Sequence, residues 1–424
     1  MPKASRRKAS RERTATVHAR VLEGGEGAVR SPRSGRAHPG TKSQLPWMTR
    51  SRPLLVQVGP VSAQASISVK RAMGSVGADA IRGTARTSAG ASADQTILCG
   101  TAEQYRQVLP KLGQPPIDLP AIAKAVRDAV KNYSTHAPRK VPTLHRPLTV
   151  GDRSRVMGIV NITPDSFWDG GRFFDPDRAL EQALTLQSEG ADLIDIGGES
   201  TRPGAPSVSV KVEWQRVGPV IDALHDSLKV PISIDTRHAE IARQALEHGA
   251  DLVNDVSALE ESAMRRLIAR TGAPAILMHM RGTPTTMQEQ TQYSDVRGEV
   301  YRELAGTVHR AIADGVAEEQ LLIDPGLGFS KTASQSLELL RHIGEFRSLG
   351  LPVVVGASRK SFLGWATGGL PLEARFEASL AAAVQLGLQG IEIVRVHDVA
   401  PTVRALRLVD ALRTGAPVKP PMGS

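Results

Sequence analysis

The feature that most constrains the fold is a regular alternation of short apolar segments with amphipathic helical patterns from residue 147 onward. The apolar segments are almost wholly hydrophobic, as expected for parallel strands that are buried on both faces. Eight of them are present, at 156–160, 193–196, 232–234, 252–253, 275–278, 321–323, 353–355 and 391–396. Most are followed by a helical pattern, as at 179–189 and 239–248. Eight such strands predict a (β/α)8 TIM barrel in the α/β class, and an open doubly wound sheet is the alternative.

The basic charge of the chain is confined to its N-terminal part. The 424 residues carry a formal net charge of +10. Residues 1–100 hold 17 Lys and Arg against 5 Asp and Glu, a net of +12, so the remaining residues have a net of −2. Charge therefore gives no reason to expect nucleic-acid binding by the main domain, and only weak, salt-sensitive adhesion by the tail is predicted.

Composition also limits the compartment and the kind of site. The single cysteine, Cys99, excludes a disulfide framework and a CxxC metal or redox site, and it suits a reducing compartment. No apolar run approaches the length of a membrane span. We therefore expect a cytoplasmic protein. The Arg- and Ser-rich, acid-poor start leaves an organellar transit peptide as the alternative.

Composition and hydrophobic periodicity divide the chain into four segments. Residues 1–95 lack sustained periodicity and are predicted to be a basic, low-complexity and mostly disordered tail. Residues 96–146 contain a strand pattern at 96–99 and a helical pattern at 118–132, which predict a small βα-type appendage. The barrel is predicted over 147–415, and 416–424 form a short C-terminal tail.

Polar and charged residues stand where each predicted strand ends. They are Asn161, the segment 197–203, Asp235, Asn254 with Asp255, His279, Asp324, the segment 358–361, and Arg395 with His397. The carboxyl ends of barrel strands converge on one face, where TIM-barrel active sites lie. Helix capping explains some of the Ser, Asp and Asn residues, but not Lys360, Arg202, Arg395 or His397. The cations suit an anionic group, and the acceptors Asp235, Asn254 and Asp324 suit a flat heterocycle that bears N–H and NH2 groups.

These residues lie within motifs that together resemble the dihydropteroate synthase family. The motifs are MGIVNITPDSFWDGG at 157–171, DIGGESTRPG at 195–204, SIDT at 233–236, NDVS at 254–257, LMHMRGTP at 277–284, DPGLGF at 324–329, SRKS at 358–361 and RVHD at 395–398. All occur in the family's order within residues 147–415. The departures are Trp168 in place of a small polar residue, Ala258 in place of Gly and Ser330 in place of Gly.

The resemblance implies the condensation of 6-hydroxymethyl-7,8-dihydropterin pyrophosphate with p-aminobenzoate to 7,8-dihydropteroate. It implies Lys360, Arg395, His397 and Asp324 as catalytic residues, and a pterin cage of Asp235, Asn254, Asp324 and Lys360. Asn161, Arg395 and His397 would bind pyrophosphate, with Asn161 also placing Mg2+. The p-aminobenzoate pocket would comprise Asp165, Phe167, Thr201, Arg202, Pro203, Phe329 and Ser361.

The resemblance also implies a homodimer formed through the later barrel helices, and an enzyme inhibited by sulfonamides. Two other functions remain open at this stage. One is a pterin-barrel methyltransferase that moves a methyl group from methylfolate to a corrinoid. The other is an inactive pterin-binding paralogue. The Ser-Thr-Arg-Pro loop, the SRKS segment and the Arg-x-His end favour the synthase over both.

Overall fold

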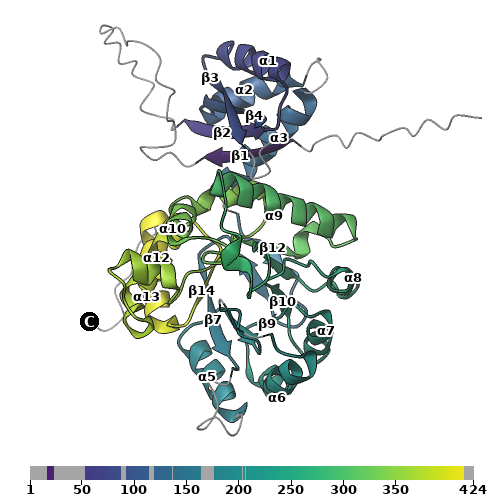
Figure 1. Ribbon diagram of the computed structural model, residues 1–424, viewed down its shortest axis with the longest axis vertical. Helices are drawn as coiled ribbons and strands as arrows, with labels where there is room; N and C mark the ends of the chain where they lie inside the picture. Colours follow the sequence, from purple (N-terminus) through teal and green to yellow (C-terminus); the bar gives the residue numbers. More distant parts are fainter. Residues whose placement is uncertain are drawn as a thin grey trace, which may run out of the picture. The chain divides into compact units, whose positions relative to one another are not determined.

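The computed structural model describes residues 17–22, 53–86, 92–113, 119–135, 137–163, 176–202, 204–205 and 207–414 (Figure 1). The chain divides into two compact units, one comprising described residues up to Val130 and the other chiefly those from Lys131 onward. Within the described residues, no helix is both long enough and apolar enough to cross a membrane.

The first unit contains a four-stranded antiparallel sheet of order β1–β2–β4–β3. Its strands are β1 (His18–Leu22), β2 (Leu54–Gly59), β3 (Asp79–Arg86) and β4 (Ser92–Gly100). Its helices are α1 (Ala63–Gly74), α2 (Ala102–Leu112) and most of α3 (Leu119–Ser134). Side-chain caps define two of the helix starts. The Ser62 hydroxyl accepts from the Ala65 amide at 3.1 Å, and Thr101 and Gln104 form a reciprocal capping box.

The expectation of a disordered tail over residues 1–95 was wrong for His18–Leu22 and for residues 54–86, which form ordered elements. The expected boundary at residue 95 falls inside β4, which pairs with both β2 and β3. Composition averaged over the whole segment hid the alternation of β2, where Val56 and Val58 are buried. The helix expected at 118–132 is α3, and Asp118 lies outside the described residues.

The second unit is the barrel. Its eight strands are parallel and follow the order β12–β11–β10–β9–β8–β7–β14–β13. They are β7 (Arg155–Asn161), β8 (Leu193–Gly197), β9 (Ile232–Asp235), β10 (Leu252–Asp255), β11 (Ala275–Met278), β12 (Leu321–Asp324), β13 (Val354–Gly356) and β14 (Ile393–Val396). A parallel bridge between Ile323 and Val353 joins the two end strands. The sheet therefore closes on itself, which confirms the barrel and excludes the open doubly wound sheet.

Helices follow the strands and form the outer layer of the barrel, as Figure 1 shows. They are α5 (Pro176–Ser188), α6 (Val210–Ser227), α7 (Ala239–Glu247), α8 (Ser262–Thr271), α9 (Val296–Ala313), α10 (Ala333–Arg341), α11 (Ser361–Ala366), α12 (Phe376–Leu388) and α13 (Val399–Thr414). Apolar side chains of strands and helices, such as Ile194, Ile234 and Leu224, pack into one large cluster. Burial of this cluster is the main stabilising contribution to the unit.

A hairpin closes the amino end of the barrel. Strands β5 (Arg139–Val141) and β6 (Leu148–Val150) pair antiparallel just before β7. Their buried side chains belong to a second apolar cluster with residues from the starts of the barrel strands, including Leu193, Leu252 and Ile393. Apolar side chains thus pack at the amino end of the barrel, and the candidate site residues lie at the carboxyl ends of the strands.

Candidate active site

Strand register brings the predicted polar residues to one level at the carboxyl ends of the strands. Asn161 of β7 is in register with Gly197 of β8, Gly197 with Asp235 of β9, and Asp235 with Asn254 of β10. On the far side of the barrel, Met278 is in register with Asp324 of β12. The sequence placed these residues at strand ends, and the parallel register makes them neighbours.

Arg395 lies between two carboxylates at this end of the barrel. Its Nε donates to Asp195 Oδ2 at 2.6 Å, and its Nη2 donates to Asp235 Oδ2 at 2.9 Å. Asn254 Nδ2 donates to the same Asp195 oxygen at 3.1 Å. Burial and the neighbouring Asp195 carboxylate raise the pKa of Asp235, which Arg395 partly offsets. The four residues form a compact donor and acceptor cluster, which we call the polar cage.

The polar cage offers unused acceptors. Asp195 Oδ1 and Asp235 Oδ1 are both buried and make no hydrogen bond with any described residue. A buried acceptor without a partner costs free energy, so a ligand with N–H or NH2 donors would be stabilised here. Asp195 was not among the residues singled out from the sequence. The signal was present, because a fully buried aspartate inside the apolar strand Leu193–Gly197 requires a polar partner.

Asp324 and Lys360 form the opposite wall. Asp324 Oδ1 accepts from the Gly326 amide at 2.8 Å, and Lys360 Nζ donates to the Leu327 carbonyl at 2.6 Å. Lys360 Nζ also lies 4.4 Å from the centroid of the Phe329 ring. Burial lowers the pKa of Lys360 to about 8, although the Asp324 carboxylate opposes this shift. The lysine thus places a partly dehydrated ammonium group beside an aromatic face.

His397 lies beside Ser358 rather than acting as an additional cation. The Ser358 hydroxyl is 3.0 Å from His397 Nδ1 and accepts from the His397 amide at 3.2 Å. Burial, together with the charges of Arg395 and Arg359, lowers the pKa of His397 to about 4. The imidazole is therefore neutral near pH 7 and can serve as a hydrogen-bonding group.

The expected p-aminobenzoate residues are only partly described. Asp165, Phe167 and Pro203, together with Trp168, lie outside the described residues. Among the others, Phe329 is half-buried, Thr201 is half-buried, and Arg202 and Ser361 are exposed. Ser361 is the first residue of α11. The structure thus brings Phe329 close to Lys360.

Glu199, Glu213 and His238 form a second polar cluster, in which Glu199 belongs to the loop that follows β8. His238 Nε2 is 4.0 Å from Glu199 Oε2 and 3.9 Å from Glu213 Oε2. A carboxylate pair with a histidine resembles a metal-ligand set. However, Arg237 Nε donates to Glu199 at 3.0 Å, and the charge of Arg216 acts on Glu213. Arg237 already pairs with Glu199, and burial raises the pKa of Glu213 to about 7, so Glu213 is partly protonated at neutral pH. We therefore assign this cluster a structural role.

Comparison with known proteins identifies the family. Residues 157–397 match the model of the pterin binding enzymes. The dihydropteroate synthase of a Synechocystis strain is 46% identical over 286 residues, covering 67% of this chain and 99% of that protein. The chain belongs to the dihydropteroate synthase family. The Escherichia coli K12 dihydropteroate synthase is 46% identical over 256 residues, covering 60% of this chain and 90% of that protein.

Solved structures of dihydropteroate synthases agree in fold. The Xanthomonas albilineans enzyme with 4-aminobenzoic acid has a TM-score of 0.62 and 42% identity, covering 66% of this chain and 100% of that one. The same enzyme with 7,8-dihydropteroate has a TM-score of 0.59 and 39% identity over the same shares. These proteins are named as dihydropteroate synthases, so the methyltransferase alternative receives no support from them.

Proposed function

We propose that the barrel condenses 6-hydroxymethyl-7,8-dihydropterin pyrophosphate with p-aminobenzoate, giving 7,8-dihydropteroate and pyrophosphate for folate biosynthesis. The observation that carries the proposal is the polar cage, whose unused Asp195 and Asp235 oxygens suit a heterocycle bearing N–H and NH2 groups. Family membership and the likeness to structures that hold 4-aminobenzoic acid and 7,8-dihydropteroate support it.

In this proposal the pterin ring lies at the carboxyl ends of the strands. Asp235 and Asp324 accept from the ring and its amino group, Asn254 offers both a donor and an acceptor, and Lys360 lies beside the ring. The family resemblance implied these four roles, and Asp195 joins them because it anchors Arg395 and Asn254. Arg395 already holds the Asp235 carboxylate and the Gly326 amide holds that of Asp324, so the two carboxylates need little reorganisation when the pterin binds.

The p-aminobenzoate would lie on the Phe329 side of the pocket. We propose that Phe329 contacts its ring, that Ser361 binds its carboxylate, and that Thr201 and Arg202 belong to the loop that closes over it. Asp165, Phe167 and Pro203 keep their predicted roles in the same two loops. Closure would exclude water and orient the amine towards the methylene carbon that it attacks.

The pyrophosphate would leave past Arg395, His397 and Asn161. Arg395 is paired with Asp195 and Asp235, so it would meet the leaving group with only part of its hydrogen-bonding capacity. His397 is neutral and can donate one hydrogen bond. These groups would stabilise the negative charge that develops as the carbon–oxygen bond breaks, while the electron-rich pterin delocalises the positive charge.

The residues present are compatible with Mg2+. Asn161 Oδ1 and Asp235 Oδ2 both lie close to Gly197, which has no side chain to separate them. Mg2+ binds few protein oxygens and completes its shell with water and substrate phosphates. We propose that Asn161 holds the ion, which would offset the charge of the pyrophosphate when bound.

One assay tests the proposed function. Purified protein is incubated with dihydropterin pyrophosphate, p-aminobenzoate and Mg2+, and dihydropteroate and pyrophosphate are quantified. We expect equal amounts of both products, with none when p-aminobenzoate is omitted and much less after chelation of Mg2+. Absence of dihydropteroate with both substrates present would overturn the proposal.

The first unit is expected to be dispensable for this activity when it is removed at its true boundary. A chain beginning at Lys131 should keep kcat/KM within a few-fold, because every candidate site residue lies in the second unit. A chain beginning at Thr96 keeps most of β4 without its partner strands, so it should aggregate. Solubility and kcat/KM of the two truncations test this. A loss beyond ~100-fold in a soluble chain from Lys131, about 2.7 kcal/mol, would contradict it.

We also propose that the enzyme is a cytoplasmic homodimer formed through the later barrel helices. Leu408 and Leu412 of α13 are 63% and 69% exposed and lie one helical turn apart, and Leu388 at the end of α12 is 51% exposed. Exposed apolar groups of this kind favour burial against a second copy. Replacing Leu408 and Leu412 with Glu should yield monomers in sedimentation velocity, whereas Ile312→Glu on α9 should not. A wild-type chain that sediments as a monomer would refute the dimer.

A further inference from the structure

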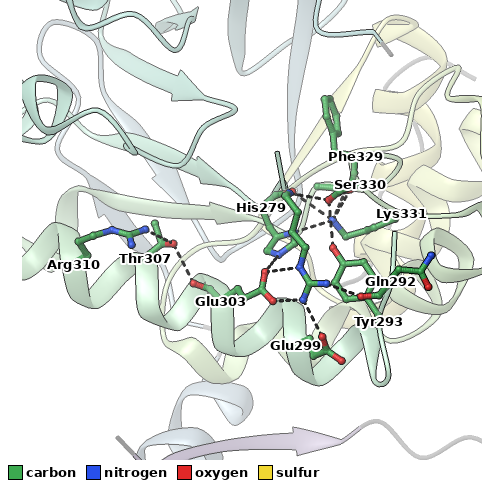
Figure 2. Close-up of polar contacts among 12 residues, drawn as sticks. His279, Gln292, Tyr293, Glu299, Glu303, Thr307, Arg310, Phe329, Ser330 and Lys331 are labelled. Atoms are coloured by element: carbon green, nitrogen blue, oxygen red, sulfur yellow. Dashed lines mark hydrogen bonds and ion pairs between the residues drawn. The ribbon is translucent and has the colours of Figure 1, made fainter. Parts of the chain in front are cut away.

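A buried polar network ties the loop after β12 to the loop after β11 (Figure 2). Lys331, which is only 3% exposed, reaches back over its own loop. Its Nζ donates to the carbonyls of Gly326 at 3.0 Å and Phe329 at 2.9 Å, and it lies 3.0 Å from His279 Nδ1. The lysine thus holds the loop that carries Asp324 and Phe329.

The protonation of His279 follows from its partners. Burial lowers the pKa of Lys331 to about 7, and its ammonium form can only donate, so His279 Nδ1 accepts from that form. Nε2 then carries the hydrogen and donates to Glu303 Oε2 at 2.9 Å. Burial and the Lys331 charge lower the pKa of His279 to about 4, which agrees with a neutral ring. Arg281 binds the same Glu303 carboxylate, with Nε at 3.1 Å from Oε2, so the network extends to α9.

Ser330 occupies a backbone conformation that favours glycine. Its φ is +47°, in the left-handed region, which costs a serine roughly 1 kcal/mol relative to a relaxed conformation. Its hydroxyl is fully used: it donates to the Phe329 carbonyl at 2.7 Å and accepts from the Arg281 amide at 2.9 Å. The Tyr293 hydroxyl lies 3.3 Å from the same oxygen. The hydrogen bonds offset the strain.

The carbonyl of Phe329 therefore receives two donors, one from Lys331 and one from Ser330. The same residue presents its ring to Lys360, whose Nζ is 4.4 Å from the ring centroid. The two donors fix the peptide plane that follows Phe329, and with it the direction in which the side chain leaves the loop towards Lys360.

We propose that Ser330 and Lys331 are positioning residues for the p-aminobenzoate substrate, acting through the backbone of Phe329. This inference rests on the proposed function, since it takes Phe329 as part of the p-aminobenzoate pocket. Neither residue touches substrate. Their effect is to fix the ring of Phe329 beside Lys360, so that the aromatic substrate meets a prepared surface.

Two variants of Ser330 separate positioning from simple stabilisation. Both Ser330→Gly and Ser330→Ala remove the hydroxyl, but only glycine also relieves the strain at φ +47°. Thermal stability should therefore be lower in Ser330→Ala than in Ser330→Gly. The KM for p-aminobenzoate should rise by roughly 3- to 10-fold in both, the range expected for one hydrogen bond. The KM for dihydropterin pyrophosphate should stay within two-fold.

The outcomes are distinct. An unchanged KM for p-aminobenzoate in soluble Ser330→Gly would overturn the proposal. A rise only in the less stable Ser330→Ala would do the same, because it would show a purely structural role. Lys331→Met removes the second donor, and we expect the same selective change with a larger amplitude. If the wild type makes no dihydropteroate, the proposed function fails, and that result is distinguishable from a failure of this inference.

Discussion

Replacing Asp324 with alanine is expected to weaken binding of the dihydropterin substrate by roughly 10²- to 10⁴-fold. A hydrogen bond to a charged group contributes about 1.5–3 kcal/mol, and a carboxylate that accepts from two ring donors would lose both. Asp324 is 7% exposed and lies at the end of β12, facing Lys360, so water cannot fully replace the lost acceptor. Calorimetry with the pterin substrate measures the change.

The barrel should remain folded in this variant. Burial raises the pKa of Asp324, which means that the folded protein destabilises the charged form. Removing the charge therefore offsets part of the cost of losing the 2.8 Å bond from the Gly326 amide. Asp324→Asn is the matched control, because it keeps an oxygen acceptor for the Gly326 amide while it removes the charge and the second acceptor. Unchanged pterin affinity in Asp324→Ala would end the assignment of Asp324 to the pterin site.

The barrel was predictable from sequence because its strands are buried on both faces. Such strands appear as short, wholly apolar runs, and the observed β8 and β12 begin at the predicted residues. The antiparallel sheet of the first unit was not predicted, because a strand such as β2 is not buried on both faces. In β2 the buried Val56 and Val58 alternate with less buried residues, and the polar Gln57 interrupts the apolar run. Its partner strands are also distant in sequence.

The site was only partly predictable, because sequence gives the ends of strands but not the partners of side chains. Asn254 and Asp235 could be predicted as neighbours from parallel pairing alone. The double pairing of Arg395 with Asp195 and Asp235 could not, since it depends on which side chains point into the barrel. Ser330 appeared in the sequence only as a departure from a glycine. Its role became visible once its φ and its hydrogen bonds were known.

The buried Glu213 is expected to make the free energy of unfolding depend strongly on pH. This side chain is fully buried on α6, and its two carboxylate oxygens are poorly satisfied by the part of the chain that the structure describes. Burial, above all, raises the pKa of Glu213 from its ordinary 4.5 to about 7, although the nearby Thr236 opposes this shift. The folded state thus holds this proton more tightly than the unfolded state does. Stability should fall as pH rises from about 4.5 to 7 and then level off.

At pH 8 the raised pKa of Glu213 lowers the free energy of unfolding by about 3 kcal/mol, since each pKa unit corresponds to ~1.4 kcal/mol. Glu213→Gln keeps the shape of the side chain and cannot ionise. The variant should match the wild type near pH 4 and exceed its free energy of unfolding by about 3 kcal/mol at pH 8. Buried carboxyl groups on which Glu213 does not act, such as Asp255, titrate alike in both proteins and cancel in the comparison.

Urea denaturation across pH 4–8 provides the measurement, with the m-value checked for constancy. Glu240→Gln is the control, because Glu240 is exposed on α7 and its bond with Arg243 lowers its pKa. That variant should gain no stability as the pH rises. If the wild type and Glu213→Gln give parallel curves, Glu213 is ionised in the folded protein at no cost. The charges of Arg237 and Arg216 must then compensate for its burial fully.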